Sequence, residues 1–374
     1  MVPTPALHAL IDQASLAPIF DDLARFYSNN LPAYPATPYS TLVKHIASQD
    51  PIEAIKYWNS ILPNDTEPCH LTFPISSSNT DPQNMSIRHT IIPLSSSTKS
   101  LLSNASLTEY TPSTVLRTAW ALLLQQHTGS SSPIFGYGVS GRDVPIDNIE
   151  SIPGPFLNIL ACRISLAGTP NRAAVTTLLE NMQTQFLESL PYQHHFLTFA
   201  AQRQHLRARN GNPDDLAGGA PTRFLFNTLF NFRRNVSVAR TEDGELAALD
   251  FKPVGEEDPF DYDIVVEIDH TESGDFVAKL TSWTHVVPEA DVIKLAEEYA
   301  DLVAAVVGEL TFGICKGDFS HEDRHEAQRF LIRRRDPLKE SQAIGEYLNF
   351  IPVELADLDD VGALLSGLSG QLSM

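Results

Sequence analysis

The sequence predicts a mixed α/β fold. Segments whose apolar residues recur with helical spacing alternate along the chain with short runs rich in Val, Ile and Phe, which favour strands. The chain has 374 residues, 43% of them hydrophobic, so it can bury a substantial core.

The N-terminal part predicts two amphipathic helices. In residues 15–28 the apolar side chains share one helical stripe, which indicates the first helix. The Pro-rich segment 31–40 predicts an extended connection. Residues 50–63 predict the second helix, which Pro63 ends. A linker rich in Ser, Asn, Asp and Pro occupies residues 63–84.

The central part contains the strongest helix signal of the chain. Residues 85–94 first show β character. Residues 111–127 then predict a helix with Thr111 as its N-cap and Pro112 at its first position. Because this segment is apolar on nearly every face, we expect the helix to be buried.

The remaining elements alternate between strand and helix. We predict strands over 133–141, 156–166, 224–232 and 262–268, helices over 171–190 and 292–310, and a flexible loop over 210–221. Beyond Leu310 the chain is charged, contains three arginines at 333–335 and ends in a Gly/Ser/Leu stretch, which is typical of a loosely packed tail.

Composition argues against several classes of partner. The net charge of −20 repels nucleic acid backbones and anionic lipid surfaces. The three cysteines, Cys69, Cys162 and Cys315, are too few and too scattered for a disulfide framework or a CxxC metal clip. No basic leader and no apolar run of about 18 residues is present. We therefore expect a cytoplasmic chain with neither a nucleic acid nor a membrane partner.

Two short motifs point to acyl transfer. His8 and Asp12 form an HxxxD motif, and residues 137–142 read YGVSGR. An imidazole accepts a proton near neutral pH, while an ionised carboxylate four residues later can fix the surrounding backbone and cations. Surface turns also supply HxxxD by chance, so its context has to carry the interpretation.

That context resembles the condensation domains of nonribosomal peptide synthetases, within the chloramphenicol acetyltransferase-like superfamily. The resemblance covers residues 7 to 310, and five segments carry it in the family's order: HALIDQASLAPIFDDLARFY, YWNSIL, TPSTVLRTAWALLLQQHTGSSSPIFGYGVSGRDVPI, GPFLNILACRISL and NTLFNFR. It implies the chloramphenicol acetyltransferase-like α+β two-layer sandwich, mainly its second lobe.

The chain departs from this family in two ways. The family signature HHxxxDG begins here with Leu7 instead of His and ends with Gln13 instead of Gly. A side chain at position 13 could strain a left-handed backbone or crowd the catalytic tunnel, which in this family lies between the two lobes. Family members also place most of a first lobe before the signature. We therefore expect a first-lobe remnant over 1–62, a second lobe over 63–310 and a charged tail over 311–374.

The resemblance implies a reaction and roles for particular residues. The family forms an amide bond between a carrier-tethered acyl thioester and a carrier-tethered amine. His8 would be the catalytic residue, which takes the proton or holds the amine in line. Asp12 and Arg142 would form a structural pair that supports it. The candidates for lining the tunnel are Gly138, Ser140, Gly141 and Asn227.

The resemblance also implies partners. The chain itself would bind no metal and no cofactor, since phosphopantetheine is carried on the substrates. The partners would be a peptidyl or acyl carrier protein and a missing first lobe or synthetase subunit. Local clusters of arginine on an acidic chain could steer carrier docking, and the candidates are Arg203, Arg207, Arg233 and Arg234.

Two other functions stay open at this point. A degenerate lobe could bind a carrier protein or a complementary lobe without turnover. A CoA-dependent acyltransferase acting on a hydroxyl would share the HxxxD motif, although the chain has no DFGWG-like element.

Three further patterns favour structural interpretations. Gly136, Gly138 and Gly141 match GxGxxG, but a turn rather than a phosphate-binding helix is expected after Arg142. Residues 321–325 read HExxH, yet the intervening Asp and Arg are typical of a solvated first helical turn. The doublet at residues 194–195 has no Asp at the family spacing, so a surface or semi-buried role is favoured.

Overall fold

The computed structural model describes part of the chain and contains two sheets. The described residues are 2–4, 10–27, 37–74, 86–103, 110–166, 172–209, 222–234, 251–253, 261–271, 273–315 and 353–355. Three short strands form the smaller sheet, in the order β1 (Val2–Thr4), β9 (Val353–Leu355) and β6 (Phe251–Pro253). The larger sheet has six strands and forms the body of the fold.

The six-stranded sheet is mixed. Its order is β2 (Ile87–Ile91), β8 (Phe276–Trp283), β7 (Ile264–His270), β5 (Thr228–Arg234), β3 (Ile134–Val139) and β4 (Asn158–Arg163). The β3–β5 and β5–β7 pairs are parallel, whereas β4, β8 and β2 pair antiparallel with their neighbours. The central strands β3 and β5 are buried over most of their length. Strand β3 accordingly reads as an apolar run broken only by glycines, whereas β5 also buries polar side chains.

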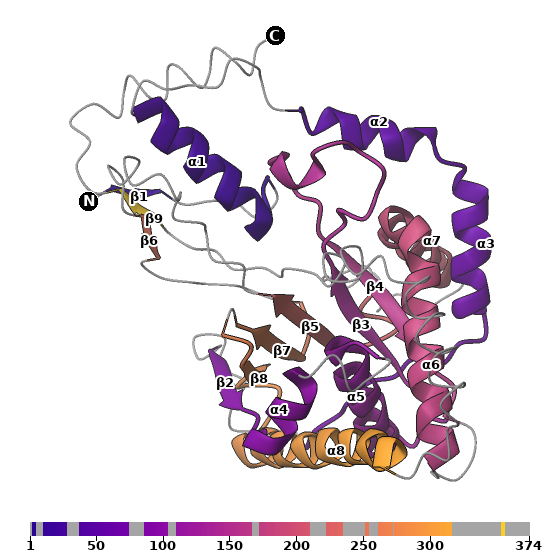
Figure 1. Ribbon diagram of the computed structural model, residues 1–374. Helices are drawn as coiled ribbons and strands as arrows, with labels where there is room; N and C mark the ends of the chain where they lie inside the picture. The colour runs from indigo at the N-terminus through magenta and orange to yellow at the C-terminus, as the bar shows by residue number, and fades with distance from the viewer. Residues whose placement is uncertain are drawn as a thin grey trace, which may run out of the picture.

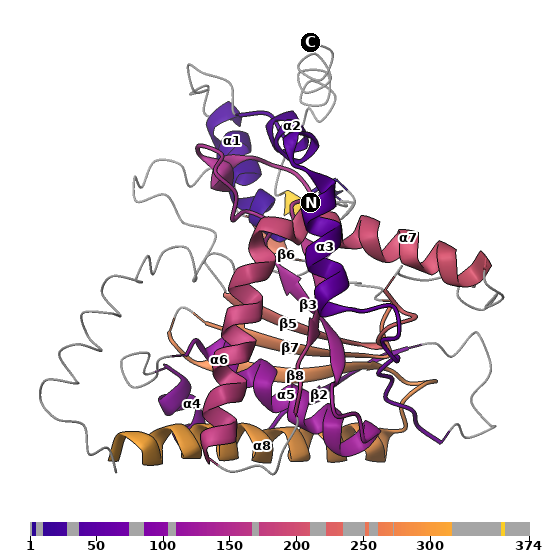
Figure 2. The same cartoon turned by 90° about the vertical axis from the view of Figure 1, so that its right-hand side faces the viewer.

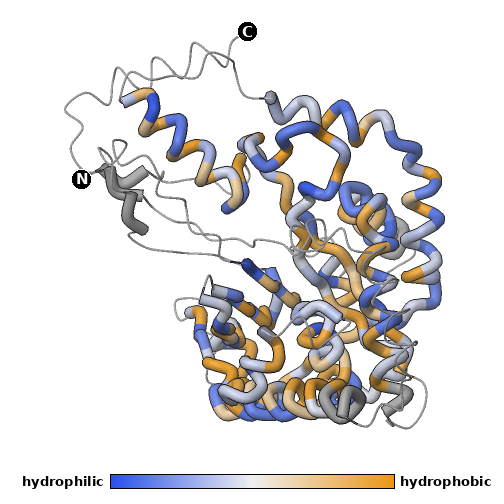
Figure 3. The backbone as a smooth tube through the Cα atoms, in the orientation of Figure 1, coloured by the Kyte–Doolittle hydropathy of each residue, from blue (hydrophilic) through white to orange (hydrophobic). Residues whose placement is uncertain are grey.

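A layer of helices packs beside this sheet. Helix α5 (Pro112–Thr128) lies between the sheet and α8 (Glu289–Cys315), and α6 (Arg172–Ser189) packs against both helices (Figure 1, Figure 2). The Trp120 and Tyr299 rings meet edge to face at 5.6 Å between centroids. Most of α5 is buried, as its sequence predicts. Figure 3 shows hydrophobic residues concentrated in the strands and in these helices. The mixed α/β prediction is therefore confirmed.

The N-terminus of α5 has a well-formed cap. Thr111 has extended backbone angles, and its side chain accepts a hydrogen bond from the Thr114 backbone N–H at 3.1 Å. We expect Thr111→Ala to lower the free energy of unfolding by about 1 kcal/mol, because one backbone donor of the first turn loses its partner. Urea unfolding followed by tryptophan fluorescence measures this loss. Gln126→Ala, at an exposed position of the same helix, is the control and should change stability by less than about 0.5 kcal/mol.

The helices around β4 join the N-terminal part of the chain to the main core. Helix α3 (Pro51–Ile61) packs on the 3-10 helix η4 (Leu190–His195) and on α7 (Phe196–Arg209). The Trp58 indole N–H donates to the Tyr192 carbonyl at 3.1 Å, and its ring lies 4.4 Å from that of Phe196. Trp58 is fully buried in the main core. The division at residues 62 and 310 stays a prediction, but α3 shares its core with the segment that follows.

A second, smaller core lies beside the first. It is formed by one residue of α2 (Ser40–Ser48) and three residues from the segment between β3 and β4, namely Leu42, Ile149, Ile152 and Phe156. The short helix η3 (Ile149–Ser151) belongs to that segment. This core attaches α2 to the segment that carries the candidate site.

Several elements differ from the sequence prediction. Helix α1 (Leu16–Tyr27) and helix α3 are present where they are expected. The sequence analysis did not predict α2, α4 (Ser96–Ser103), α7 or β8. Helix α4 is short and mostly polar, so it lacks the apolar stripe that marks α1. The loop over 210–221 and the arginines at 333–335 lie outside the described residues.

Two further findings concern the described part of the chain. None of its helices combines the length and the apolar character that a membrane crossing needs.

Cys69 and Cys162 are both buried free thiols. Burial raises the pKa of Cys162 to about 12, so this thiol is held in its neutral form.

Candidate functional site

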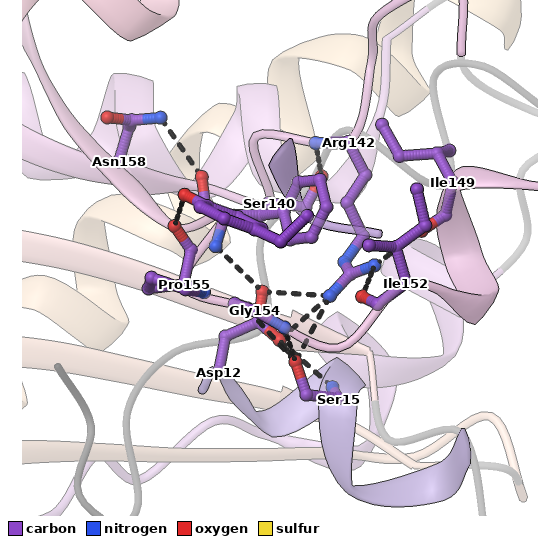
Figure 4. A network of polar contacts seen from close by, with 11 residues as sticks. Asp12, Ser15, Ser140, Arg142, Ile149, Ile152, Gly154, Pro155 and Asn158 are labelled. Carbon is purple, nitrogen blue, oxygen red and sulfur yellow. Dashed lines mark hydrogen bonds and ion pairs between the residues drawn. The ribbon is translucent and has the colours of Figure 1, made fainter. Parts of the chain in front are cut away.

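The centre of the candidate site is a buried ion pair between Asp12 and Arg142. The Arg142 Nη2 atom donates to Asp12 Oδ1 at 2.9 Å and to Oδ2 at 3.1 Å. The side chains of Arg142 and Asp12 are only 2% and 4% exposed. The two residues are 130 positions apart, so the pair ties the N-terminal segment to the loop that follows β3 (Figure 4). This is the pair expected from the sequence.

The local sequence explains how the carboxylate is held. Asp12 is the N-cap of the 3-10 helix η1 (Gln13–Ser15), and its Oδ1 accepts from the Ser15 N–H at 2.9 Å. The same oxygen lies 2.5 Å from Ser15 Oγ and Oδ2 lies 3.3 Å from the Phe156 N–H, which donates to it. A hydroxyl has one proton, and the Ser15 hydroxyl donates it to the Asp12 carboxylate, which is nearer than the Gly154 carbonyl oxygen at 3.0 Å. The Ser15 oxygen in turn accepts from the Gly154 N–H at 2.9 Å. The Asp12 charge is thus fully satisfied inside the protein.

The guanidinium of Arg142 organises the segment between β3 and β4. Its Nη1 atom donates to the carbonyls of Ile149, at 2.7 Å, and Ile152, at 3.1 Å. The Phe156 ring lies under the guanidinium, 4.0 Å from its carbon to the ring centroid, and adds a cation–π contact. Arg142, near the start of this segment, therefore also holds its middle and its end in place.

Two glycines allow the close approaches in this network. Gly141 has φ +72°, and a Cβ there would lie 1.8 Å from the Phe156 carbonyl oxygen. A Cβ on Gly154 would lie 2.1 Å from the ring of Tyr39. The Tyr39 hydroxyl donates to the Pro155 carbonyl at 2.9 Å, and its ring meets that of Phe156 edge to face at 5.2 Å. Backbone and rings are in direct contact here, so the site has no room for larger residues at either position.

The charge of Asp12 acts on its neighbours. The pKa of the Tyr39 hydroxyl is raised, first because the ring is partly buried and then because Asp12 is near, while Arg142 opposes the shift. Tyr39 is therefore a neutral hydrogen-bond donor. Asp12 and Arg142 are buried and engaged with protein groups, so the arrangement suits anchoring of the N-terminal segment rather than direct chemistry on a substrate.

The catalytic candidate precedes this anchor in the sequence. His8 lies outside the described residues, as does Leu7.

Gln13, which stands where the family has Gly, begins η1 and is not among the described residues with a left-handed backbone. The expected strain at a positive φ is therefore wrong, because a 3-10 helical residue tolerates a side chain. The Gln13 Oε1 atom is buried and finds no hydrogen-bond partner among the described residues.

The tunnel-lining candidates occupy different environments. Gly138 lies in β3, and Ser140 and Gly141 form the turn before Arg142, where the Arg142 N–H donates to Ser140 Oγ at 3.3 Å. Asn227 is buried, donates to the carbonyl of Leu71 at 2.7 Å and accepts from its N–H at 2.9 Å. Asn227 thus holds a neighbouring chain segment. The lining role of these four residues stays a prediction.

The structure corrects part of the docking prediction, which assumed exposed cations. Arg203 is buried, and its guanidinium donates to the carbonyls of Leu62 and Pro63. Arg233 is also buried, and its Nε and Nη2 atoms donate to Asp269 at 2.7 and 3.0 Å. A guanidinium that is buried and already hydrogen-bonded to protein groups cannot contact a docking partner directly. Arg234 is exposed, and the side chain of Arg207 is not described. For these two residues docking stays a prediction.

Sequence reasoning missed residues that complete the network. Ser15 and Gly154 contact each other across 139 positions, and Tyr39 reaches Pro155 across 116. The histidine doublet at residues 194–195 also contacts a residue next to this network, because His194 Nδ1 lies 3.0 Å from the Asn158 amide nitrogen. Only the contact with Ser15 has a local signal, since Asp is a preferred N-cap residue and its side chain accepts from a backbone N–H two or three residues later.

The competing motifs do not form sites in the described residues. Gly136, Gly138 and Gly141 lead into a turn, without the helix that a bound pyrophosphate requires. Within the described ranges, no group of three or more His, Cys, Asp or Glu side chains is placed to hold a metal ion. The HExxH residues 321–325 lie outside those ranges.

Comparison with known proteins supplies the family. The condensation-domain family model matches residues 7–314. Nonribosomal peptide synthetase atnA from Emericella nidulans is 33% identical over 297 residues, which cover 79% of this chain and 4% of the relative. The FR901469 synthetase from a Dothideomycetidae species is 32% identical over 268 residues, which cover 71% of this chain and 2% of the relative. The chain thus spans only a small fraction of the length of these synthetases.

Solved structures share the fold. The condensation domain of the monacolin K polyketide synthase MokA superposes with a TM-score of 0.54 at 16% identity and covers 82% of this chain and 68% of that one. The epimerization domain from the third module of tyrocidine synthetase B gives a TM-score of 0.55 at 13% identity, with the same coverage. The fold predicted from the sequence, that of the chloramphenicol acetyltransferase-like condensation domains, is thereby confirmed.

Proposed function

Because the chain belongs to the condensation-domain family of nonribosomal peptide synthetases, we propose that it catalyses amide formation between two carrier-tethered substrates. The acceptor amine attacks the carbonyl of the donor thioester, a C–N bond forms, and the C–S bond to the phosphopantetheine thiol breaks. The amine proton passes to His8 and from there to the leaving thiolate. Phosphopantetheine thus belongs to the substrates, and carrier proteins are the partners.

The observation that supports this proposal is the buried Asp12–Arg142 pair. Asp12 is fixed by contacts with Arg142, Ser15 and Phe156, which come from η1 and from the segment between β3 and β4. Its own backbone N–H also donates to the Gly154 carbonyl at 3.3 Å. His8 stands four positions earlier in the sequence, and four residues of chain reach at most about 14 Å. An anchor this close limits the positions that the imidazole can reach, which is what general base catalysis requires.

The proposal is tested with the purified chain and two loaded carrier proteins. One carrier holds an aminoacyl thioester as donor, the other an aminoacyl acceptor, and mass spectrometry of the carriers detects the amide. We expect product with the parent chain and at least a hundredfold slower formation with His8→Ala, since a positioned general base contributes about 10²–10⁴-fold. His127→Ala is the control, because His127 is an exposed histidine on α5 that contacts Glu298. Equal product from His8→Ala and parent would contradict the assigned role.

The same assay separates the two alternatives. Acyl transfer from free acyl-CoA to a hydroxyl, without any carrier, would identify an O-acyltransferase. Association without turnover would identify a binding lobe. One observation favours a partner surface, since several large apolar side chains of the N-terminal helices and the turn before them are exposed: Leu10, Phe26, Tyr27, Val43 and Ile52.

A further inference from the structure

Two side chains, the amide of Asn158 and the imidazole of His194, lie next to the turn that carries Arg142. Asn158, at the start of β4, places its side-chain nitrogen 3.0 Å from the Phe156 carbonyl oxygen and 3.0 Å from His194 Nδ1 in η4. The Phe156 carbonyl is the group that a Cβ on Gly141 would strike, and the same Cβ would lie 3.3 Å from the Asn158 nitrogen. Gly141, Phe156, Asn158 and His194 therefore meet at one point, immediately next to Arg142.

The hydrogen-bond partners determine the state of the imidazole. A carbonyl oxygen can only accept, so the group that Asn158 turns toward Phe156 is its NH₂. The second hydrogen of that NH₂ then points to His194 Nδ1, which must accept it. His194 is consequently neutral, with its proton on Nε2. A proton on Nδ1 would bring two donors face to face and break the contact.

The surroundings of His194 maintain this neutral state. Its Nε2 atom is buried and has no hydrogen-bond partner within the part of the chain that the structure describes. Burial lowers the pKa of His194 to about 4, and the neighbouring His195 and the His45 of α2 act in the same direction, while the Gly141 backbone opposes them. Within the described ranges, the titratable groups that act on the ring are therefore His195 and His45.

We infer that neutral His194 is a positioning residue, which holds the Phe156 carbonyl against Gly141 through Asn158 and so fixes the turn that presents Arg142 to Asp12. His194 acts on this turn through Asn158. Its effect on product formation rests on the function proposed above, whereas its effect on the turn does not.

Matched variants at one position test the inference. Asn places an oxygen close to the position of Nδ1, so His194→Asn retains an acceptor for Asn158, whereas His194→Leu has a similar size and no acceptor. His195→Leu is the control within the same doublet, because His195 Nε2 contacts Gln49 Oε1 at 3.0 Å instead of the turn. Hydrogen exchange with mass spectrometry reads out residues 140–156, and exchange of α5 verifies that each variant is folded.

We expect at least tenfold faster exchange over residues 140–156 in His194→Leu, and exchange close to that of the parent in His194→Asn and His195→Leu. Amide formation should fall about tenfold to hundredfold in His194→Leu and recover in His194→Asn, because misplacement of a supporting group carries costs of this order. If exchange over 140–156 in His194→Leu matches the parent, or if His194→Asn is as fast as His194→Leu, the inference is overturned. Restored protection in His194→Asn with no product from the parent chain would instead contradict the proposed function alone.

Acidification provides a second readout. The unfolded chain takes up a proton on this histidine near pH 6.5, whereas the folded chain resists until about pH 4. The contribution of neutral His194 to stability is therefore complete above pH 6.5 and is lost as the pH falls toward 4. Protection of residues 140–156 should decline over this range in the parent and change less in His194→Asn. An identical decline in both proteins would count against the inference.

Discussion

Removing either charge of the Asp12–Arg142 pair is expected to lower the free energy of unfolding by about 3–5 kcal/mol, because the remaining charge is left buried without its partner. Arg142→Met keeps an apolar stem of similar length and leaves the Asp12 carboxylate with neutral donors only. Asp12→Asn keeps an acceptor and leaves the guanidinium without a counterion. Urea unfolding followed by circular dichroism measures both losses.

The double variant distinguishes a coupled pair from two independent residues. Asp12→Asn combined with Arg142→Met removes both charges, so its loss should be smaller than the sum of the single losses by about 2 kcal/mol or more. The matched control is the pair of Asp21 and Arg25 on α1, which has the same charges at 2.7 Å but is 36% and 39% exposed. Arg25→Met should cost less than about 0.5 kcal/mol, since water screens that pair. Additive losses at residues 12 and 142 would show that the contact contributes little.

The effect should reach activity as well. Both single variants should loosen the attachment of residues 10–12, and His8 stands four positions before Asp12 in the sequence. We therefore expect the proposed amide formation to fall in both variants even at temperatures where they remain folded.

How much of this site the sequence predicts depends on how each residue is held. The partnership of Asp12 and Arg142 was predicted because both residues lie in motifs that the family shares. The roles of Tyr39 and Gly154 were not predicted, because their contacts join segments far apart in the chain. Neither residue is charged, so the sequence does not indicate that it needs an ionic partner. His194 was identified as part of a doublet, but its neutral state depends on Asn158, which only the fold brings near.

The arginines show the opposite error. A cluster of cations in the sequence suggests a solvated surface, yet Arg203 and Arg233 lie among carbonyl and carboxylate groups inside the protein. Spacing alone gives the sign of a charge and not its burial. The same limit applies to the elements. Helix α5 has a cap and a long apolar run and was predicted, whereas α4 is short and mostly polar and was missed.

Gly141→Ala is expected to be far more damaging than the same substitution at Gly129, although the two backbones are nearly identical. Gly141 has φ +72° and Gly129 has φ +69°, so an alanine pays a similar conformational strain of about 1–2 kcal/mol at either position. The surroundings differ, since the new Cβ would meet the Phe156 carbonyl at 1.8 Å in the first case and no atom of a described residue within 4 Å in the second. Overlap with a backbone carbonyl adds about 1–3 kcal/mol more, because that carbonyl can move only if the segment between β3 and β4 shifts.

We therefore expect Gly129→Ala to cost about 1 kcal/mol after the gain from a stiffer unfolded chain, and Gly141→Ala to cost about 3 kcal/mol or more. Thermal unfolding of both variants gives the difference directly. In Gly141→Ala the displaced Phe156 carbonyl would also pull the Phe156 N–H away from Asp12 and its ring away from Arg142, so the loss should extend to amide formation. Equal losses at the two glycines would mean that the turn yields without strain, and a turn that yields cannot hold Arg142 in a fixed position against Asp12.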